Sequence, residues 1–300
     1  MDDAPPGRGR EVPGPGPVTG AGLLTALCAA RERSAESHRA DRLFEDRVAH
    51  VATELVGGPP RTPRRPGERS SGERATGERA SAMSELVALR TRFFDDELRA
   101  ASGQCRQVVL LGAGLDSRAF RLDWPQGTEV YELDRGDVLR FKRGVVARAG
   151  QEPRCTRVEV AADLRGDWPG ALRAAGFNPW RPTAWAAEGL LPLLSRTEND
   201  QLLSGITAMS AAAGRLVADH FDSALREALE RTAMTEVLRA VGASWNSTLE
   251  APQEWLAPHG WAFGLTDPRE LARRSGREIS GVFGSRAHGA GHLWLLSAVR

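Results

Sequence analysis

Residues 107–134 read QVVLLGAGLDSRAFRLDWPQGTEVYELD, and this stretch decides the fold. Its apolar run over residues 108–111 is typical of a strand that is buried on both faces. The chain then breaks at Gly112 and Gly114, passes through a short helical segment and enters a second apolar run that ends at Asp134. This order of strand, glycine turn, helix, strand and acid predicts a unit that binds a nucleoside-containing cofactor.

The residues of the glycine turn indicate which cofactor fits. Glycine has no Cβ and tolerates positive φ, so a ligand can approach the backbone closely there. Asp134 lies about 20 residues further on, where a carboxylate can accept hydrogen bonds from a ribose. Ser117 stands at the third glycine position of the dinucleotide fingerprint, and Asp116 would repel a diphosphate. S-adenosylmethionine carries a sulfonium, an amino group and a ribose but no phosphate, so it suits this turn; the alternative is an ordinary turn without a ligand.

Four motifs together give the sequence a family resemblance. They are residues 108–134, LRTRFFD at 89–95, ADLR at 162–165 and WAAEGLL at 185–191. The set resembles the bacterial members of the leucine carboxyl methyltransferase family, which are S-adenosyl-L-methionine-dependent methyltransferases. The resemblance implies an α/β fold, with a Rossmann-like class I methyltransferase sheet, helices on both faces and an N-terminal helical lid. It also implies S-adenosyl-L-methionine as the cofactor.

The composition narrows the class of protein. The chain has 300 residues, 41% of them hydrophobic, and a net charge of +1, so nothing in its charge favours nucleic acid or an anionic membrane surface as a partner. Cys28, Cys105 and Cys155 lie far apart and match neither a metal site nor a disulfide framework. No apolar run approaches the ~18 residues of a membrane span, and the N-terminus lacks an apolar signal core. We therefore expect a cytoplasmic protein that binds no metal, no nucleic acid and no membrane.

The chain divides into four predicted segments. Residues 1–22 are rich in proline and glycine, and we predict that they are disordered. Residues 23–56 form the helical lid, predicted as helix over 23–55 with Asp41 as a possible cap. Residues 57–82 repeat Gly-Glu-Arg without apolar periodicity, which favours a flexible insertion over a basic tail that binds nucleic acid. Residues 83–300 form the methyltransferase domain.

Arg90 is the predicted ligand of the cofactor's carboxylate. It lies in a helix predicted over residues 84–98, beside a stripe of apolar side chains. Such an arginine most often extends along the surface or pairs with an acid. The resemblance assigns this segment to the methionine moiety of the cofactor, and a guanidinium matches a carboxylate bidentately. Arg92 is the second choice.

Asp163 and Leu164 are the predicted contacts of the adenine. They follow a strand predicted over residues 157–161, and ligands of open α/β sheets bind at the carboxyl ends of the strands. The alternative is that Asp163 only caps the next turn. The resemblance favours the adenine, with the carboxylate facing the amino group and the leucine forming an apolar wall.

Glu188 and His220 are the two candidate catalytic residues. Glu188 follows a strand predicted over residues 183–187, where a buried carboxylate needs a partner: the cofactor's amino group, the methyl acceptor or a nearby arginine. His220 lies in a strand predicted over residues 215–221, and it is either a general base or only hydrogen-bonded. A carboxylate acceptor, being ionised at neutral pH, needs no general base, whereas a hydroxyl or amine acceptor does.

Three functions remain open on the sequence. The first is an S-adenosyl-L-methionine-dependent methyltransferase that O-methylates a carboxyl or hydroxyl group of a small molecule. The second is a protein that binds this cofactor without turnover, because Leu193 stands where the family usually has tyrosine and Arg47 where it usually has proline. The third is a nicotinamide-dependent reductase, which Ser117 disfavours, as does the lack of a Tyr-x-x-x-Lys pair: the one tyrosine is Tyr131.

Overall fold

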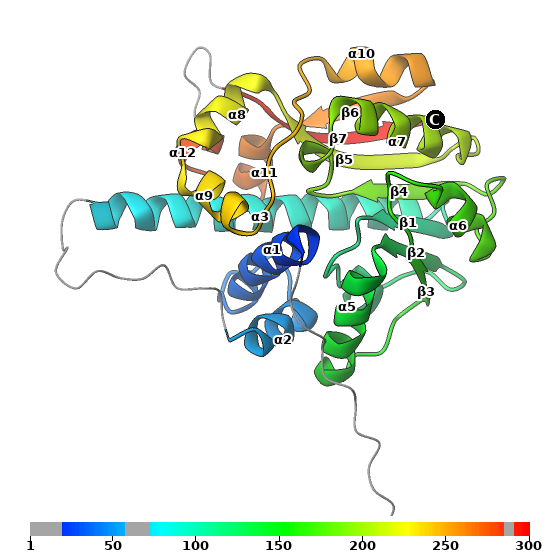
Figure 1. The fold of residues 1–300 in the computed structure, drawn as a ribbon, viewed down its shortest axis with the longest axis horizontal. Helices are drawn as coiled ribbons and strands as arrows, with labels where there is room; N and C mark the ends of the chain where they lie inside the picture. Colours follow the sequence, from blue (N-terminus) through cyan, green and yellow to red (C-terminus); the bar gives the residue numbers. More distant parts are fainter. Residues whose placement is uncertain (1–19, 58–71, 285–290) are drawn as a thin grey trace, which may run out of the picture.

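The computed structural model describes residues 20–57, 72–284 and 291–300 (Figure 1). Most of the segment predicted as disordered, and residues 58–71 of the predicted insertion, lie outside this range. Within it, none of the helices is both long and apolar enough to cross a bilayer.

A single sheet of seven strands organises the described part of the chain, in the order β3-β2-β1-β4-β5-β7-β6. Strands β1 to β5 are parallel, and β7 runs antiparallel to both β5 and β6. Their bounds are β1 Gln107–Leu111, β2 Glu129–Asp134, β3 Thr156–Ala161, β4 Thr183–Ala187, β5 Arg215–Phe221, β6 Ala262–Thr266 and β7 Leu293–Val299. The predicted α/β class is confirmed, and the strand order reverses between β1 and β4, the point at which ligands bind in such sheets.

The alternation of side chains along each strand creates two apolar cores. In β1, Val108 and Leu110 face one core, and Val109 and Leu111 face the other. The first core is covered by α1, α2, α3 and α5, and the second by α6, α7 and α10, as Figure 1 shows. All five residues of β1 are buried, as the unbroken apolar run predicted.

The helices connect the strands in chain order. Their bounds are α1 Ala21–Ser37, α2 Arg47–Leu55, α3 Gly72–Ser102, α4 Arg118–Arg121, α5 Gly136–Ala149, α6 Trp168–Ala174, α7 Arg196–Ala208, α8 Ser223–Glu230, α9 Ala233–Ala240, α10 Pro252–Leu256, α11 Pro268–Arg274 and α12 Gly281–Gly284, with 3-10 turns η1 Leu191–Leu193 and η2 Ala257–His259. The Ser195–Glu198 capping box begins α7.

The N-terminal segment forms two helices instead of the one that was predicted over residues 23–55. The chain leaves the helix after Ser37 and re-enters it at Arg47. The cap of the second helix is Asp46 and not Asp41: its Oδ1 accepts a hydrogen bond from the backbone N–H of Ala49 at 2.9 Å. A side-chain acceptor at this position satisfies an N–H that has no partner within the helix, and therefore sets where α2 begins.

Helix α3 begins well before the predicted start at residue 84. It starts at Gly72, so the last part of the segment predicted as a flexible insertion is helical. The prediction for residues 72–82 was therefore wrong. The reason is local: Pro66 is the last proline before this helix, and the chain beyond it is rich in alanine, glutamate and arginine, which favour helix.

Candidate functional site

The glycine turn after β1 is built as the sequence predicted. Gly112 and Gly114 have φ values of 61° and 44°, in the left-handed region that favours glycine. A Cβ on Gly112 would lie 3.2 Å from Leu190 Cδ1, and one on Gly114 would lie 3.0 Å from Ala26 Cβ in α1. Both the backbone conformation and close neighbours on either side therefore require glycine here.

Asp134 joins the end of β2 to the glycine turn. Its Oδ2 accepts a hydrogen bond from Gly114 N–H and its Oδ1 accepts one from Arg135 N–H, both at 2.7 Å. Burial raises the pKa of Asp134, and these two hydrogen bonds oppose the shift. A carboxylate has about four acceptor positions, so each oxygen keeps capacity for a ribose hydroxyl.

Arg90 reaches from α3 to the ends of β4 and β5. Its Nε lies 3.1 Å from Glu188 Oε1, and its Nη1 lies 3.3 Å from Asp219 Oδ2. The other oxygen of Asp219 accepts a hydrogen bond from Gly189 N–H at 2.6 Å. The structure thus brings two predicted site residues, Arg90 and Glu188, into contact, and it shows that an arginine pairs with the glutamate.

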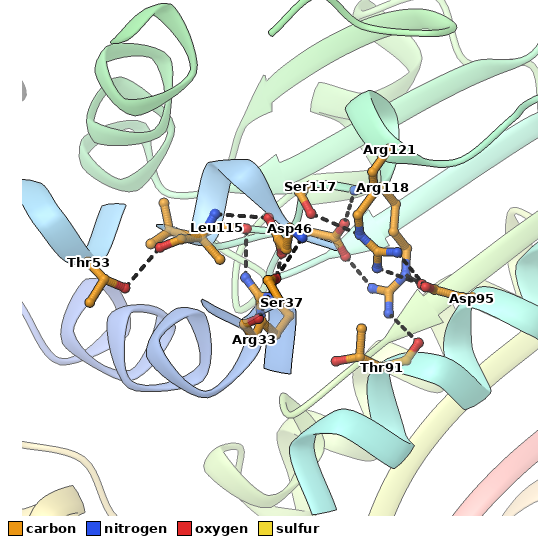
Figure 2. Close-up of polar contacts among 12 residues, drawn as sticks. Arg33, Ser37, Asp46, Thr53, Thr91, Asp95, Leu115, Ser117, Arg118 and Arg121 are labelled. Atoms are coloured by element: carbon orange, nitrogen blue, oxygen red, sulfur yellow. Dashed lines mark hydrogen bonds and ion pairs between the residues drawn. The ribbon is translucent and has the colours of Figure 1, made fainter. Parts of the chain in front are cut away.

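Arg118 is a central residue of this region that the sequence analysis missed. It is 2% exposed, and its guanidinium contacts three carboxylates: Glu188 Oε2 at 2.7 Å, Asp95 Oδ1 at 2.7 Å and Asp116. Arg121 holds the other oxygen of Asp95 (Figure 2). Asp95 is fully buried in α3, which the spacing of the apolar residues did not show, and a buried acid needs a cation.

Asp116 does not offer a free negative charge to a ligand. Burial raises its pKa, but Arg118, Lys142 and the hydrogen bond from Arg118 N–H outweigh burial and hold the pKa at about 2. The carboxylate is therefore ionised and already neutralised by Arg118, which corrects the expectation that it faces a cationic ligand.

The charged groups around the turn form one network with a surplus of acid. Three guanidinium groups meet four carboxylates, which leaves one net negative charge when all are ionised. The members are Arg90, Arg118, Arg121, Asp95, Asp116, Glu188 and Asp219. A ligand with a net positive charge complements such a site.

Helices α1 and α2 lie over the glycine turn as a lid. Arg33 in α1 donates one hydrogen bond to Leu115 O in the turn and another to Asp46 Oδ2, both at 2.8 Å (Figure 2). Arg47, at the position where the family usually has proline, donates from its Nε to Ala149 O in α5 at 3.0 Å. The substitution therefore replaces a rigid residue by a contact that still fixes α2 to the domain.

Asp163 and Leu164 follow β3 at the same edge of the sheet. Asp163 is exposed, and its Oδ1 accepts a hydrogen bond from Arg165 N–H at 2.9 Å, so it stabilises the turn as the alternative reading proposed. Leu164 packs against the second core. Because one oxygen of Asp163 remains available, the turn does not occupy the whole carboxylate.

His220 lies on the other face of the sheet from Glu188 and Arg90. Its Nδ1 accepts a hydrogen bond from Phe221 N–H at 2.8 Å, which places the ring proton on Nε2, 3.2 Å from Ser247 Oγ. Burial lowers the pKa of His220 to about 4. Since neither ring nitrogen has a free lone pair, the geometry favours the hydrogen-bonded reading over a general base.

The order of the strands and the glycine turn after β1 are those of a Rossmann-like α/β methyltransferase fold. The acidic network beside the turn suits the cationic cofactor of this class of protein. A crystal structure of a DUF574 family protein from Streptomyces avermitilis shares this fold, with a TM-score of 0.54 at 13% identity over 87% of this chain and all of that one. The leucine carboxyl methyltransferase family model matches residues 26–207.

Proteins that are similar in sequence support the same family. A protein from Parafrankia sp. is 43% identical over 85% of this chain and 81% of its own length, and one from Streptomyces avermitilis is 40% identical over 85% and 88%. Both are named as S-adenosyl-L-methionine-dependent methyltransferases. The chain belongs to the leucine carboxyl methyltransferase family, and the predicted resemblance is confirmed.

Proposed function

We propose that this protein is an S-adenosyl-L-methionine-dependent methyltransferase that transfers the methyl group to a carboxylate oxygen of a small molecule. The cofactor would supply an activated methyl group on a sulfonium. The relatives named above support this donor. The proposal includes two predictions made from the sequence: the acceptor is a small molecule, and the protein acts in the cytoplasm.

The residues of the glycine turn fit this cofactor. Gly112 and Gly114 hold the turn at positive φ with their backbone free of side-chain atoms, and Asp134 keeps acceptor positions for ribose hydroxyls. Asp163 and Leu164 would face the adenine. The surplus negative charge of the network complements a ligand with a sulfonium, an ammonium and one carboxylate. A diphosphate would add negative charge to that acidic network, which disfavours a nicotinamide dinucleotide.

Arg90 would hold the carboxylate of the cofactor. Its Nε and Nη1 contact Glu188 and Asp219, and its Nη2 takes part in neither of these ion pairs. A nitrogen that these pairs leave unused can donate to a carboxylate while the pairs fix the guanidinium in place. Glu188 would position Arg90 and face the cofactor's amino group.

Neither of the two predicted candidates, Glu188 and His220, is suited to act as a general base; this observation supports a carboxylate as the acceptor and carries the proposed reaction. Burial raises the pKa of Glu188, but Arg118 and Arg90 outweigh burial and lower it. A carboxylate with a lowered pKa is a weak base, and the lone pairs of His220 are used or protonated. A carboxylate acceptor is ionised at neutral pH and needs only alignment and exclusion of water.

Two measurements test the proposal. Calorimetry should show binding of S-adenosylmethionine and S-adenosylhomocysteine and no binding of NAD; tight NAD binding would favour a reductase. A panel of small carboxylic acids and the matching alcohols should then release S-adenosylhomocysteine with at least one acid and with none of the alcohols. Cofactor binding without any release would support the non-catalytic alternative.

A further inference from the structure

A cavity lies on the face of the sheet away from the charged network. It has a volume of about 360 Å³, within the range of roughly 300–1,000 Å³ that is usual for ligand sites. It opens between the start of α7, the end of β5 and the chain from Ser247 to His259. These elements lie near one another at the upper right of Figure 1.

The inner wall of this cavity contains a fixed hydrogen-bond network with one acceptor left over. Asn199 Nδ2 donates to Leu191 O and to Ser247 Oγ, both at 2.9 Å. Because Leu191 O can only accept, the nitrogen must face it, and the amide cannot be turned round. Asn199 Oδ1 is then a buried acceptor with no partner among the described residues, on a side chain that is 4% exposed.

The mouth of the cavity is acidic and partly apolar. Asp200, Glu250 and Glu254 line it, against one arginine, Arg196, and the side chain of Trp255 adds aromatic surface. Glu254 makes no ion pair or hydrogen bond with another side chain in the described part of the chain. A buried unpaired acceptor together with surplus acid complements a ligand that donates hydrogen bonds and carries positive charge.

We propose that this cavity binds a small molecule with an ammonium group on an aromatic or apolar frame. The ammonium would lie toward the acids at the mouth and Asn199 Oδ1, and the frame would pack on Trp255 and Pro258. The site is separate from the glycine turn, since its wall is formed by the opposite side chains of β5, His220 rather than Asp219.

Binding of matched probes tests this site. Tyramine carries the ammonium, 4-ethylphenol has the same frame without the amine, and 4-hydroxyphenylacetate replaces the amine by an acid. Titrations followed by ligand-observed NMR, with saturating S-adenosylhomocysteine present, should show that tyramine binds at least tenfold more tightly than either analogue. Absence of tyramine binding under these conditions, or equal binding of the three probes, would overturn the proposal.

A charge reversal locates the bound amine. Glu254→Arg should weaken tyramine binding at least tenfold, because it replaces an acid at the mouth by a cation. Glu227→Arg is the matched control, since Glu227 is an exposed acid of α8 outside the cavity. Equal effects of the two substitutions on tyramine affinity would show that the cavity is not the site. The readout does not depend on methyl transfer, so it is independent of the proposed activity.

Discussion

At the scale of single residues, Arg118 connects the parts of the candidate site. It contacts the loop after β1, the end of β4 and helix α3 through Asp116, Glu188 and Asp95. All of these groups are buried or partly buried, so the ion pairs act at low dielectric. Breaking such a pair on one side leaves an uncompensated buried charge, which is costly.

Replacement of Arg118 by leucine should therefore lower the free energy of unfolding by about 3–5 kcal/mol. Urea unfolding measures this value. Arg92→Leu is the control, because Arg92 forms an exposed pair with Asp96 at 2.7 Å on the same helix as Asp95. That substitution should change stability by less than about 1 kcal/mol. Similar losses for both variants would show that the Arg118 network does not stabilise the fold.

Asp134→Asn tests the ribose contact with little change of shape. The amide loses the charge and one of the two acceptor oxygens, so the affinity for S-adenosylhomocysteine should fall at least tenfold, or about 1.4 kcal/mol. Calorimetry gives the affinity. Asp137→Asn, which alters an exposed acid paired with Arg135, should leave it unchanged. An unaltered affinity in Asp134→Asn would remove Asp134 from the site.

At the scale of elements, the fit between α1 and the glycine turn decides how the site is covered. Ala26 approaches the turn, and Arg33 holds α1 to Leu115 O and to Asp46, the cap of α2. Helices α1 and α2 are therefore fixed to each other and to the turn by the same guanidinium. Under the proposed function, a cofactor that contacts the backbone of Gly114 on this side would have to displace Ala26, and α1 with it.

Gly114→Ala should displace α1. The new Cβ would lie 3.0 Å from Ala26 Cβ, in addition to the strain at positive φ, so we expect a loss of about 2–3 kcal/mol of stability and faster hydrogen exchange of the α1 amides. Gly127→Ala is a matched control, because Gly127 also has positive φ but nothing lies within 4 Å of its Cβ position. It should cost only the backbone strain, about 1–2 kcal/mol, and leave α1 exchange unchanged. Equal exchange in the two variants would mean that the turn does not hold the lid.

At the scale of the whole molecule, the sheet separates two chemically different regions. The face covered by α1, α3 and α5 holds the charged network, and the face covered by α7 and α10 holds His220 and the cavity that His220 lines. Asp219 belongs to the charged network, and the next residue of β5, His220, lines the cavity. The two lie in different regions because successive side chains of a strand point to opposite faces of the sheet.

His220 should make the protein less stable at mildly acidic pH. Burial lowers the pKa of His220 from the ordinary value of 6.5 to about 4. As the pH falls from about 6.5 to 4, the imidazole is therefore protonated in the unfolded chain but stays neutral in the folded chain. Stability is therefore lost across this window, by up to about 3 kcal/mol. Urea unfolding at pH 7 and pH 4.5 should show a smaller loss in His220→Gln than in the unsubstituted protein. The same loss in both would show that His220 is not responsible.

The sequence determined the scaffold of this protein, because the signals involved are local. The apolar runs fixed β1, β4 and β5, the glycines fixed the turn with positive φ, and Ser195 with Glu198 fixed the start of α7. The motifs around Gly112 and Glu188 were part of the set that identified the family. Each of these strands, turns and helix starts depends on the conformation and burial of a few neighbouring residues. The residue types and their spacing in the sequence therefore predict them directly.

Only the tertiary structure decided how the charged residues pair. Arg118 joins Asp95 and Glu188 across large gaps in sequence, and no spacing rule connects them. The break between α1 and α2 follows from Asp46, whose carboxylate is held by Arg33 as well as by the helix it caps. The separation of His220 from Glu188 depends on the face to which each side chain points. Such pairings are set by which elements meet in space, because a buried charge is tolerated only where another element supplies its partner.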